Sequence, residues 1–133
     1  MSAIYRDRTL ADAAVERLKA YAQPQRLMIL SCLLEGERTV GEIDEATGIG
    51  QPALSQQLAG LRRAELVSTR KEARSVFYAL ADETTVLCVR AMEAIFSGKD
   101  DPAKELAEAM GRGAVTGSAS GKTTGVAAFA RIG

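Results

Sequence analysis

Apolar residues recur at every third or fourth position along much of the chain, which is the spacing of one face of an α-helix. This pattern predicts five helices, at about residues 9–21, 24–35, 39–47, 51–64 and 83–97. The second is apolar on most of its sides, so we expect it at the centre of the core. Thr39 and Glu42 match a capping box that begins the third helix, and Asp82 is expected to cap the fifth.

The hydrophobic pattern changes between the fourth and fifth helices. Val67–Arg70 and Ser75–Leu80 are rich in β-branched and aromatic residues, and they flank the charged segment Lys71–Arg74. This arrangement predicts a β-hairpin, although its turn lacks the Gly or Asn that tight hairpins favour. A short connection around Gly48 joins the third and fourth helices. The order of elements therefore predicts a mainly α fold with a β-hairpin wing (α+β), a winged helix-turn-helix.

The last part of the chain has a different composition. Seven of the twelve Gly residues lie in residues 97–133. Such a segment has little apolar surface to offset its ordering entropy. We therefore expect one DNA-binding and dimerisation domain over residues 1–97. A Gly-rich, mobile extension over residues 98–133 is expected to form only a brief helix, from about Asp101 to Met110.

Composition excludes several classes of protein. The chain has no His, which removes His general bases, Ser-His and Cys-His pairs, and His-based zinc sites. Its two Cys are too few for a disulfide scaffold or a four-thiolate metal site. Gly117–Thr123 resembles a phosphate-binding loop, but Thr116 stands where that loop needs its first Gly. We expect no enzymatic activity, no metal and no cofactor.

The chain also lacks signals for a membrane. No apolar run approaches the ~18–20 residues needed to span a bilayer. Residues 1–12 are polar, unlike a signal peptide. We therefore expect a cytoplasmic protein without membrane contact, in which the cysteines are reduced thiols.

Charge informs only through its local distribution, because seventeen Lys and Arg balance seventeen Asp and Glu. Residues 51–80 carry five basic and two acidic residues, a net charge of +3, whereas residues 35–45 carry one basic and five acidic residues, a net charge of −4. The basic segment coincides with the fourth helix and the hairpin, where phosphate neutralisation would require it. Double-stranded operator DNA is therefore the expected partner.

Short polar side chains near the start of the fourth helix suit the reading of base edges in the major groove. A solvated polar helix face is the competing interpretation for Gln51, Ser55 and Gln56 taken alone. Basic side chains of the helix end and hairpin are expected to contact phosphates or, from the wing tip, the minor groove: Arg62, Arg63, Arg70, Lys71 and Arg74. Arg62 and Arg63 could instead pair with Glu65.

Four stretches carry a resemblance to a known family: Pro24–Leu30, Gly36–Ile43, Gln51–Leu58 and Val76–Leu80. They resemble the ArsR/SmtB family of winged-helix repressors, and most of all its thiol- and persulfide-sensing branch of BigR-, SqrR- and HlyU-like proteins. The resemblance covers roughly residues 9–97. It implies a homodimer built on the first and last helices, a pseudo-palindromic operator, and release of DNA on sensing an inducer. Gln57, within the third stretch, joins the expected DNA-binding residues.

Uncovered apolar residues also favour a dimer. Five short helices leave exposed a set from the first and last helices: Leu10, Ala14, Leu18, Val89, Met92 and Phe96. Two recognition helices about one DNA turn apart are what a palindromic site requires.

The chain departs from the family pattern at its sensing sites. Arg38–Glu42 stand where metal sensors often carry a cysteine box, and the His of the other metal site is missing. Cys32 matches one cysteine of the thiol-sensing branch, but the second is expected near Ser97, whereas this chain has Cys88. The alternative for both cysteines is that each is only a small apolar residue of the core.

The resemblance implies that Cys32 senses reactive sulfur species, with Cys88 as its partner. A bridge within one protomer, a bridge between protomers, and Cys32 acting alone all stay open. A nearby cation, Arg26 or Arg90, would favour the reactive thiolate. The alternative inducer is a thiophilic metal or metalloid. A winged-helix assembly module without an inducer is the alternative function.

Overall fold

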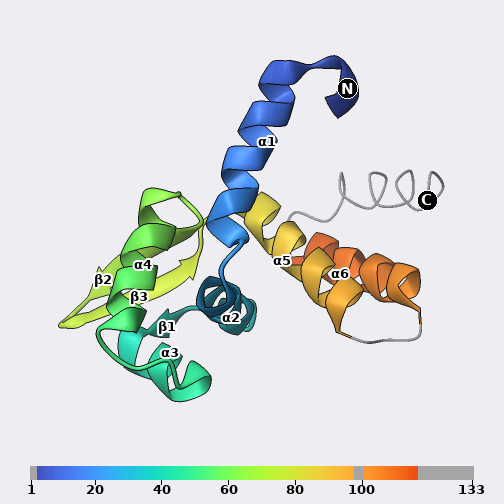
Figure 1. Cartoon of the computed structure of the whole chain (residues 1–133). Helices are drawn as coiled ribbons and strands as arrows, with labels where there is room; N and C mark the ends of the chain where they lie inside the picture. The colour runs from blue at the N-terminus through green and yellow to red at the C-terminus, as the bar shows by residue number, and fades with distance from the viewer. Residues whose placement is uncertain (1–2, 98–100, 117–133) are drawn as a thin grey trace. The chain divides into compact units, whose positions relative to one another are not determined.

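The computed structural model describes residues 3–97 and 101–116, except for the side chains of residues 109 and 112–116. The chain forms two compact units, which divide between Ala79 and Leu80. Figure 1 shows the helices and strands. The prediction of one domain ending at residue 97 stays a prediction. In the part of the chain described here, no helix is long and apolar enough to cross a membrane.

The first unit contains a short 3-10 helix, four α-helices and three strands. In chain order they are η1 (Ile4–Arg6), α1 (Arg8–Tyr21), α2 (Pro24–Leu33), β1 (Arg38–Thr39), α3 (Val40–Thr47), α4 (Ala53–Arg63), β2 (Val67–Glu72) and β3 (Ser75–Leu80). The four predicted helices and the hairpin of this unit are confirmed, with ends that differ by one to two residues. Sequence reasoning missed η1 and β1, which are too short to carry a hydrophobic period.

Local capping bonds explain where the helices begin. Gln23 accepts a hydrogen bond from the Arg26 amide at 2.9 Å and places Pro24 in the first turn of α2. The capping box of α3 is confirmed, because Thr39 Oγ1 accepts from the Glu42 amide at 3.2 Å and Glu42 Oε1 accepts from the Thr39 amide at 2.9 Å.

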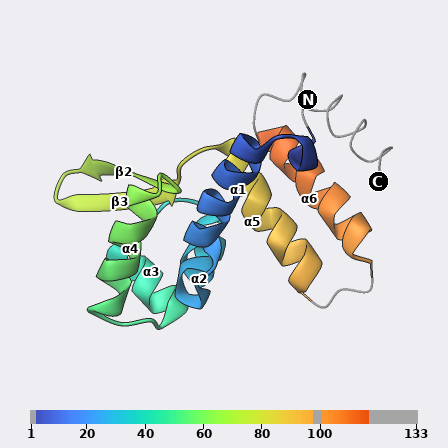
Figure 2. The same ribbon diagram turned by 45° about the horizontal axis from the view of Figure 1, so that its top comes forward.

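The three strands form one small sheet in the order β1-β3-β2. β1 pairs antiparallel with β3, with Arg38 opposite Tyr78 and Thr39 opposite Phe77. Thr39 is thus both the last residue of β1 and the cap of α3, so the sheet leads directly into the helix-turn-helix. The hairpin of β2 and β3 runs past α4 to a free tip (Figures 1 and 2).

The core of the first unit lies among α2, α3, α4 and the start of β2. Its side chains are almost fully buried: Ile29, Leu30, Leu33, Ile43, Leu54, Leu58, Leu61, Leu66 and Val67. The expected central position of α2 is confirmed on the face of Ile29, Leu30 and Leu33. Met28 on its other side is 46% exposed. Burial of these leucines is what fixes α4 on α2 and β2.

The second unit consists of α5 (Glu83–Phe96) and α6 (Pro102–Thr116), which pack against each other. The predicted cap of α5 is confirmed, because Asp82 Oδ1 accepts from the Thr85 amide at 2.8 Å. The brief helix expected to end at Met110 is too short, since α6 continues to Thr116. Packing on α5 offsets the poor helix propensity of Gly111 and its neighbours. The remainder of the extension, residues 117–133, lies outside the described residues.

Candidate nucleic-acid interface

The turn between α3 and α4 is held by one carboxylate. Asp44 Oδ1 accepts a hydrogen bond from the Gly50 amide at 2.8 Å, and its carbonyl accepts from the Gly48 amide at 2.7 Å. Gly48 takes a left-handed conformation, with φ of 69°, which ends α3 and redirects the chain. Thr47 Oγ1 donates to the Ile43 carbonyl at 2.8 Å. Sequence reasoning found the turn but missed the role of Asp44, which closes it from inside α3.

The two faces of α4 are sharply different. Leu54, Leu58 and Leu61 are buried with at most 2% exposure. The opposite face is exposed along its whole length and carries Ser55, Gln56, Ala59, Arg62 and Arg63. These positions follow the three- and four-residue spacing of one helix face. The structure therefore gathers four of the predicted DNA-binding residues on one solvent-facing strip.

The first turn of α4 is held by Gln51, which is exposed. Its Oε1 accepts from the Ser55 amide at 3.1 Å and from Ser55 Oγ at 2.7 Å. Two of the three predicted base readers, Gln51 and Ser55, thus bond each other at the start of α4. Among the described residues, no bond from the Gln51 amide NH₂ group is recorded, and this group can donate. Gln56, one residue further, forms no side-chain hydrogen bond with any described residue.

Gln57 is the predicted DNA-binding residue that the structure directs inward. Its Oε1 accepts from Arg26 Nε at 2.9 Å, and its Nε2 donates to Gln25 Oε1 at 3.5 Å. Gln57 therefore faces α2, because the helical period turns it away from Ser55 and Gln56. These bonds favour a role for Gln57 in holding α4 on α2, and its predicted DNA contact stays a prediction.

Two basic side chains near the wing tip, Lys71 and Arg74, form no ion pair with any described residue. The hairpin turn is Ala73-Arg74, with Ala73 in a left-handed conformation (φ of 56°) that side chains rarely adopt. Lys71 and Arg74 are exposed, and within the described residues neither forms an ion pair. Arg62 and Arg63 at the end of α4 are likewise exposed, and neither pairs with Glu65 in the described part of the chain.

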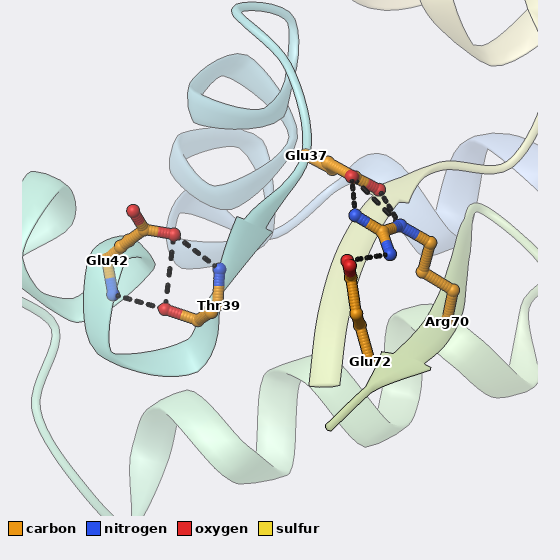
Figure 3. A network of polar contacts seen from close by, with 5 residues as sticks. All are labelled: Glu37, Thr39, Glu42, Arg70 and Glu72. Carbon is orange, nitrogen blue, oxygen red and sulfur yellow. Dashed lines mark hydrogen bonds and ion pairs between the residues drawn. The ribbon is translucent and has the colours of Figure 1, made fainter. Parts of the chain in front are cut away.

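Arg70 is engaged within the protein instead. Its guanidinium carbon lies 4.5 Å from the centre of the Phe77 ring. The guanidinium donates from Nε and Nη2 to Glu37 and from Nη1 to Glu72 at 2.6 Å (Figure 3). These bonds hold the Glu37 carboxyl pKa below its usual range and raise the pKa of Arg70. Two carboxylates thus neutralise Arg70, and its predicted phosphate contact stays a prediction. Glu37 was missed because only folding brings it to β2.

Both cysteines are free thiols and half-buried. Burial raises the pKa of the Cys32 thiol, and the nearby carboxylates Glu35 and Glu42 add to this, while Arg38 opposes it. The cation beside Cys32 is thus Arg38, whereas the predicted Arg26 is bound to Gln57. In the described residues, no three His, Cys, Asp or Glu side chains gather to hold a metal ion.

The apolar set expected on the dimer face needs one correction. Val89 is only 2% exposed and offers no free surface, and Met92 is half-buried. The exposed apolar residues of α5 are Ile95 and Phe96, at 51% and 80%. On α1, Leu18 is exposed as expected, and Val15 is exposed beside it.

Comparison with known proteins identifies the motif. The sequence signature described as "Bacterial regulatory protein, arsR family" matches residues 23–69. The Biofilm growth-associated repressor of Xylella fastidiosa is 40% identical over 93 residues, which span 70% of this chain and 82% of the relative.

Solved structures agree. HlyU from Vibrio cholerae superposes with a TM-score of 0.61 and 42% identity, covering 68% of this chain and 98% of that chain. The homodimeric winged helix-turn-helix domain Mb0332 from Mycobacterium bovis superposes with a TM-score of 0.61 and 30% identity. The match covers 73% of this chain and 88% of that chain.

These relatives are transcriptional regulators rather than enzymes, and they share the helix-turn-helix and wing described above. The signature covers α2, β1, α3, α4 and the start of β2, the part that carries the exposed polar strip. The chain therefore belongs to the ArsR/SmtB family of DNA-binding transcriptional regulators.

Proposed function

We propose that this regulator is a homodimeric repressor whose α4 reads a pseudo-palindromic operator in the major groove while the wing contacts the flanking backbone. The observation that carries the proposal is the exposed strip of α4, in which Ser55 and Gln56 precede Arg62 and Arg63, with the exposed Gln51 just before the helix. A helix-turn-helix directs the N-terminal part of its second helix at base edges. The basic C-terminal end then lies toward the phosphates.

Two groups of residues have separate roles in this proposal. Gln51, Ser55 and Gln56 contact bases, because amides and hydroxyls can both donate and accept along base edges. Arg62, Arg63, Lys71 and Arg74 neutralise phosphates, because they are exposed and free of carboxylate partners among the described residues. Binding to chromosomal DNA would place the protein in the cytoplasm.

The test is binding to the upstream region of its own operon across a series of salt concentrations. The affinity is expected to fall linearly with salt on logarithmic axes and to exceed the affinity for shuffled DNA. Binding that ignored both sequence and salt would contradict the proposal and favour a winged-helix assembly module.

The dimer is supported by apolar residues that the single chain leaves exposed. Val15 and Leu18 of α1 are 49% and 59% exposed, and Phe96 of α5 is 80% exposed. A second copy would cover such residues, and the solved Mycobacterium bovis relative is described as homodimeric.

Sedimentation equilibrium at micromolar concentration is expected to give the mass of two chains. Leu18→Glu should dissociate them and weaken operator binding. Val76→Glu changes a comparably apolar residue, 38% exposed on the wing, and should leave the dimer intact. A native protein that sediments as a monomer would contradict the dimer.

The inducer is proposed to be a reactive sulfur species that reacts with Cys32. The Cys32 thiolate attacks the outer sulfur of a low-molecular-weight persulfide, the S–S bond breaks, and the departing thiolate takes up the proton, which leaves Cys32 as a persulfide. Because burial raises the pKa of Cys32, most of the thiol is protonated at neutral pH. Arg38 stabilises the small thiolate fraction that reacts.

Cys88 is the proposed partner of Cys32. Its thiolate would take the outer sulfur of a second persulfide molecule in the same way. The Cys32 persulfide anion then attacks the Cys88 sulfur atom, hydrosulfide leaves, and a trisulfide bridge that retains one added sulfur forms. A bridge within one protomer, a bridge between protomers, and Cys32 acting alone are distinguished by the mass of the product under denaturing, non-reducing conditions.

Intact mass spectrometry after exposure to glutathione persulfide, peroxide or arsenite tests the signal, run beside DNA release by Cys32→Ser and Cys88→Ser. A gain of sulfur mass with DNA release that Cys32→Ser abolishes is the expected result. DNA release by arsenite, without release by persulfide or peroxide, would favour the metalloid alternative. Normal release by Cys32→Ser would make Cys32 a core residue only.

A further inference from the structure

Arg26 lies where three helices of the first unit meet. It belongs to α2 and is half-buried. Its Nε donates to Gln57 Oε1 on α4 at 2.9 Å, and its Nη1 donates to the Ala20 carbonyl in the last turn of α1 at 3.3 Å. One guanidinium therefore joins α1, α2 and α4.

Gly60 of α4 packs directly against this guanidinium. A Cβ atom on Gly60 would lie 3.1 Å from Arg26 Cζ and closer still to Nη2. The guanidinium thus rests directly on the backbone of α4. Gly is poor in the middle of a helix, and the close approach of Arg26 explains its presence here.

The bonds of Arg26 can determine what the leucines of α4 leave undetermined. Apolar burial is non-directional, so Leu54, Leu58 and Leu61 hold α4 on the core without fixing its rotation tightly. The planar guanidinium donates in fixed directions and accepts little angular error. Gln57 adds a second directional bond to Gln25 of α2.

We infer that Arg26, packed against Gly60, is a positioning residue that sets the orientation of α4. It thereby sets the selectivity for base sequence without itself touching DNA. The inference rests on the proposed role of α4 in reading DNA. Base contacts need precise geometry, whereas flexible Arg and Lys side chains reach phosphates from many orientations. Loss of the junction is therefore expected to lower selectivity and to leave the number of phosphate contacts unchanged.

The experiment uses DNA that the full chain itself selects from a random-sequence pool. The affinity for the selected duplex is divided by that for a shuffled duplex of the same composition, at several salt concentrations. Arg26→Ala and Gly60→Ala are each expected to lower this ratio by about tenfold or more, the size of one misread base pair. The slope of affinity against salt should not change, because it counts phosphate contacts.

A double variant tests the contact itself. In the Arg26→Ala background, Gly60→Ala should cause no further loss, because the guanidinium that its Cβ meets is gone. Gly111→Ala is the matched control, since it fills a helical glycine with nothing within 4 Å and should leave the ratio unchanged.

Three outcomes would overturn the inference. An unchanged ratio with a lowered melting temperature would make Arg26 a stabilising residue only. A smaller slope of affinity against salt would make Arg26 a phosphate contact. Additive losses of selectivity in the Arg26→Ala, Gly60→Ala double variant would contradict the contact with Gly60. If a variant fails to fold, Gln57→Glu, which keeps the acceptor for Arg26, and Gln57→Leu, which removes it, must still differ in selectivity. A native chain that selects no sequence would instead contradict the proposed function.

Discussion

The recognition helix and the wing would both contact DNA, but different forces hold them in place. α4 is held on the core by three buried leucines, and the hydrogen bond from Arg26 of α2 to Gln57 of α4 is half-buried. The wing is joined to β1 through β3, and at the surface it is held by Arg70, which bonds Glu37 and Glu72 (Figure 3). Exposed ion pairs weaken with salt and with acid, whereas apolar burial does not. The helix should therefore keep its position under conditions that loosen the wing.

The largest expected effect is on the helix core. Leu58→Ala leaves a cavity beneath α4 and should lower the free energy of unfolding by ~2–5 kcal/mol. Denaturant unfolding at low and high salt measures this loss, which should be equal in both. A loss that shrank with added salt would contradict an apolar attachment of α4.

The next effect separates base reading from phosphate binding. Gln56→Ala should cost ~1–3 kcal/mol on a selected site and nothing on shuffled DNA. Arg74→Ala on the wing should weaken both DNAs equally and flatten the salt slope. Equal losses on both DNAs for Gln56→Ala would erase the proposed division between helix and wing.

A smaller effect is expected at the junction of sheet and helix-turn-helix. Thr39→Ala removes the cap of α3 and should lower the free energy of unfolding by about 1 kcal/mol. Ser68→Ala, an exposed hydroxyl on β2, is the control and should change little. Equal melting temperatures for Thr39→Ala and the native protein would mean that the capping box does not stabilise α3.

The smallest effect is expected at the wing, through Glu37→Gln. The Glu37 pKa is lowered from 4.5 in the folded chain, so its contribution is present above pH 4.5 and lost as pH falls through the folded value. The native protein should be slightly more stable than Glu37→Gln at pH 7, and the difference should vanish on acidification or in high salt. A difference that grew below pH 4.5 would reverse the sign and contradict the bond to Arg70.

Several properties followed from the sequence because they depend on near neighbours. Helix positions come from apolar spacing within one turn, and the caps at Thr39 and Asp82 lie three residues from the amides that they bind. The same local patterns carried the family resemblance. The hairpin was also predictable, although its two-residue turn with left-handed Ala73 was not, since Ala does not signal that conformation.

Only the tertiary structure decided which polar side chains are free to meet DNA. Arg70 and Glu37 are 33 residues apart, and Arg26 and Gln57 are 31 apart. No local pattern predicts such pairs, because each forms only when separate elements have packed together. Arg70 and Gln57 were predicted to contact DNA and are hydrogen-bonded to other side chains of the chain, while Gln56 and Arg74 keep their groups exposed. Composition and period specify which side chains a helix or strand carries, but long-range packing specifies which of them remain unpaired.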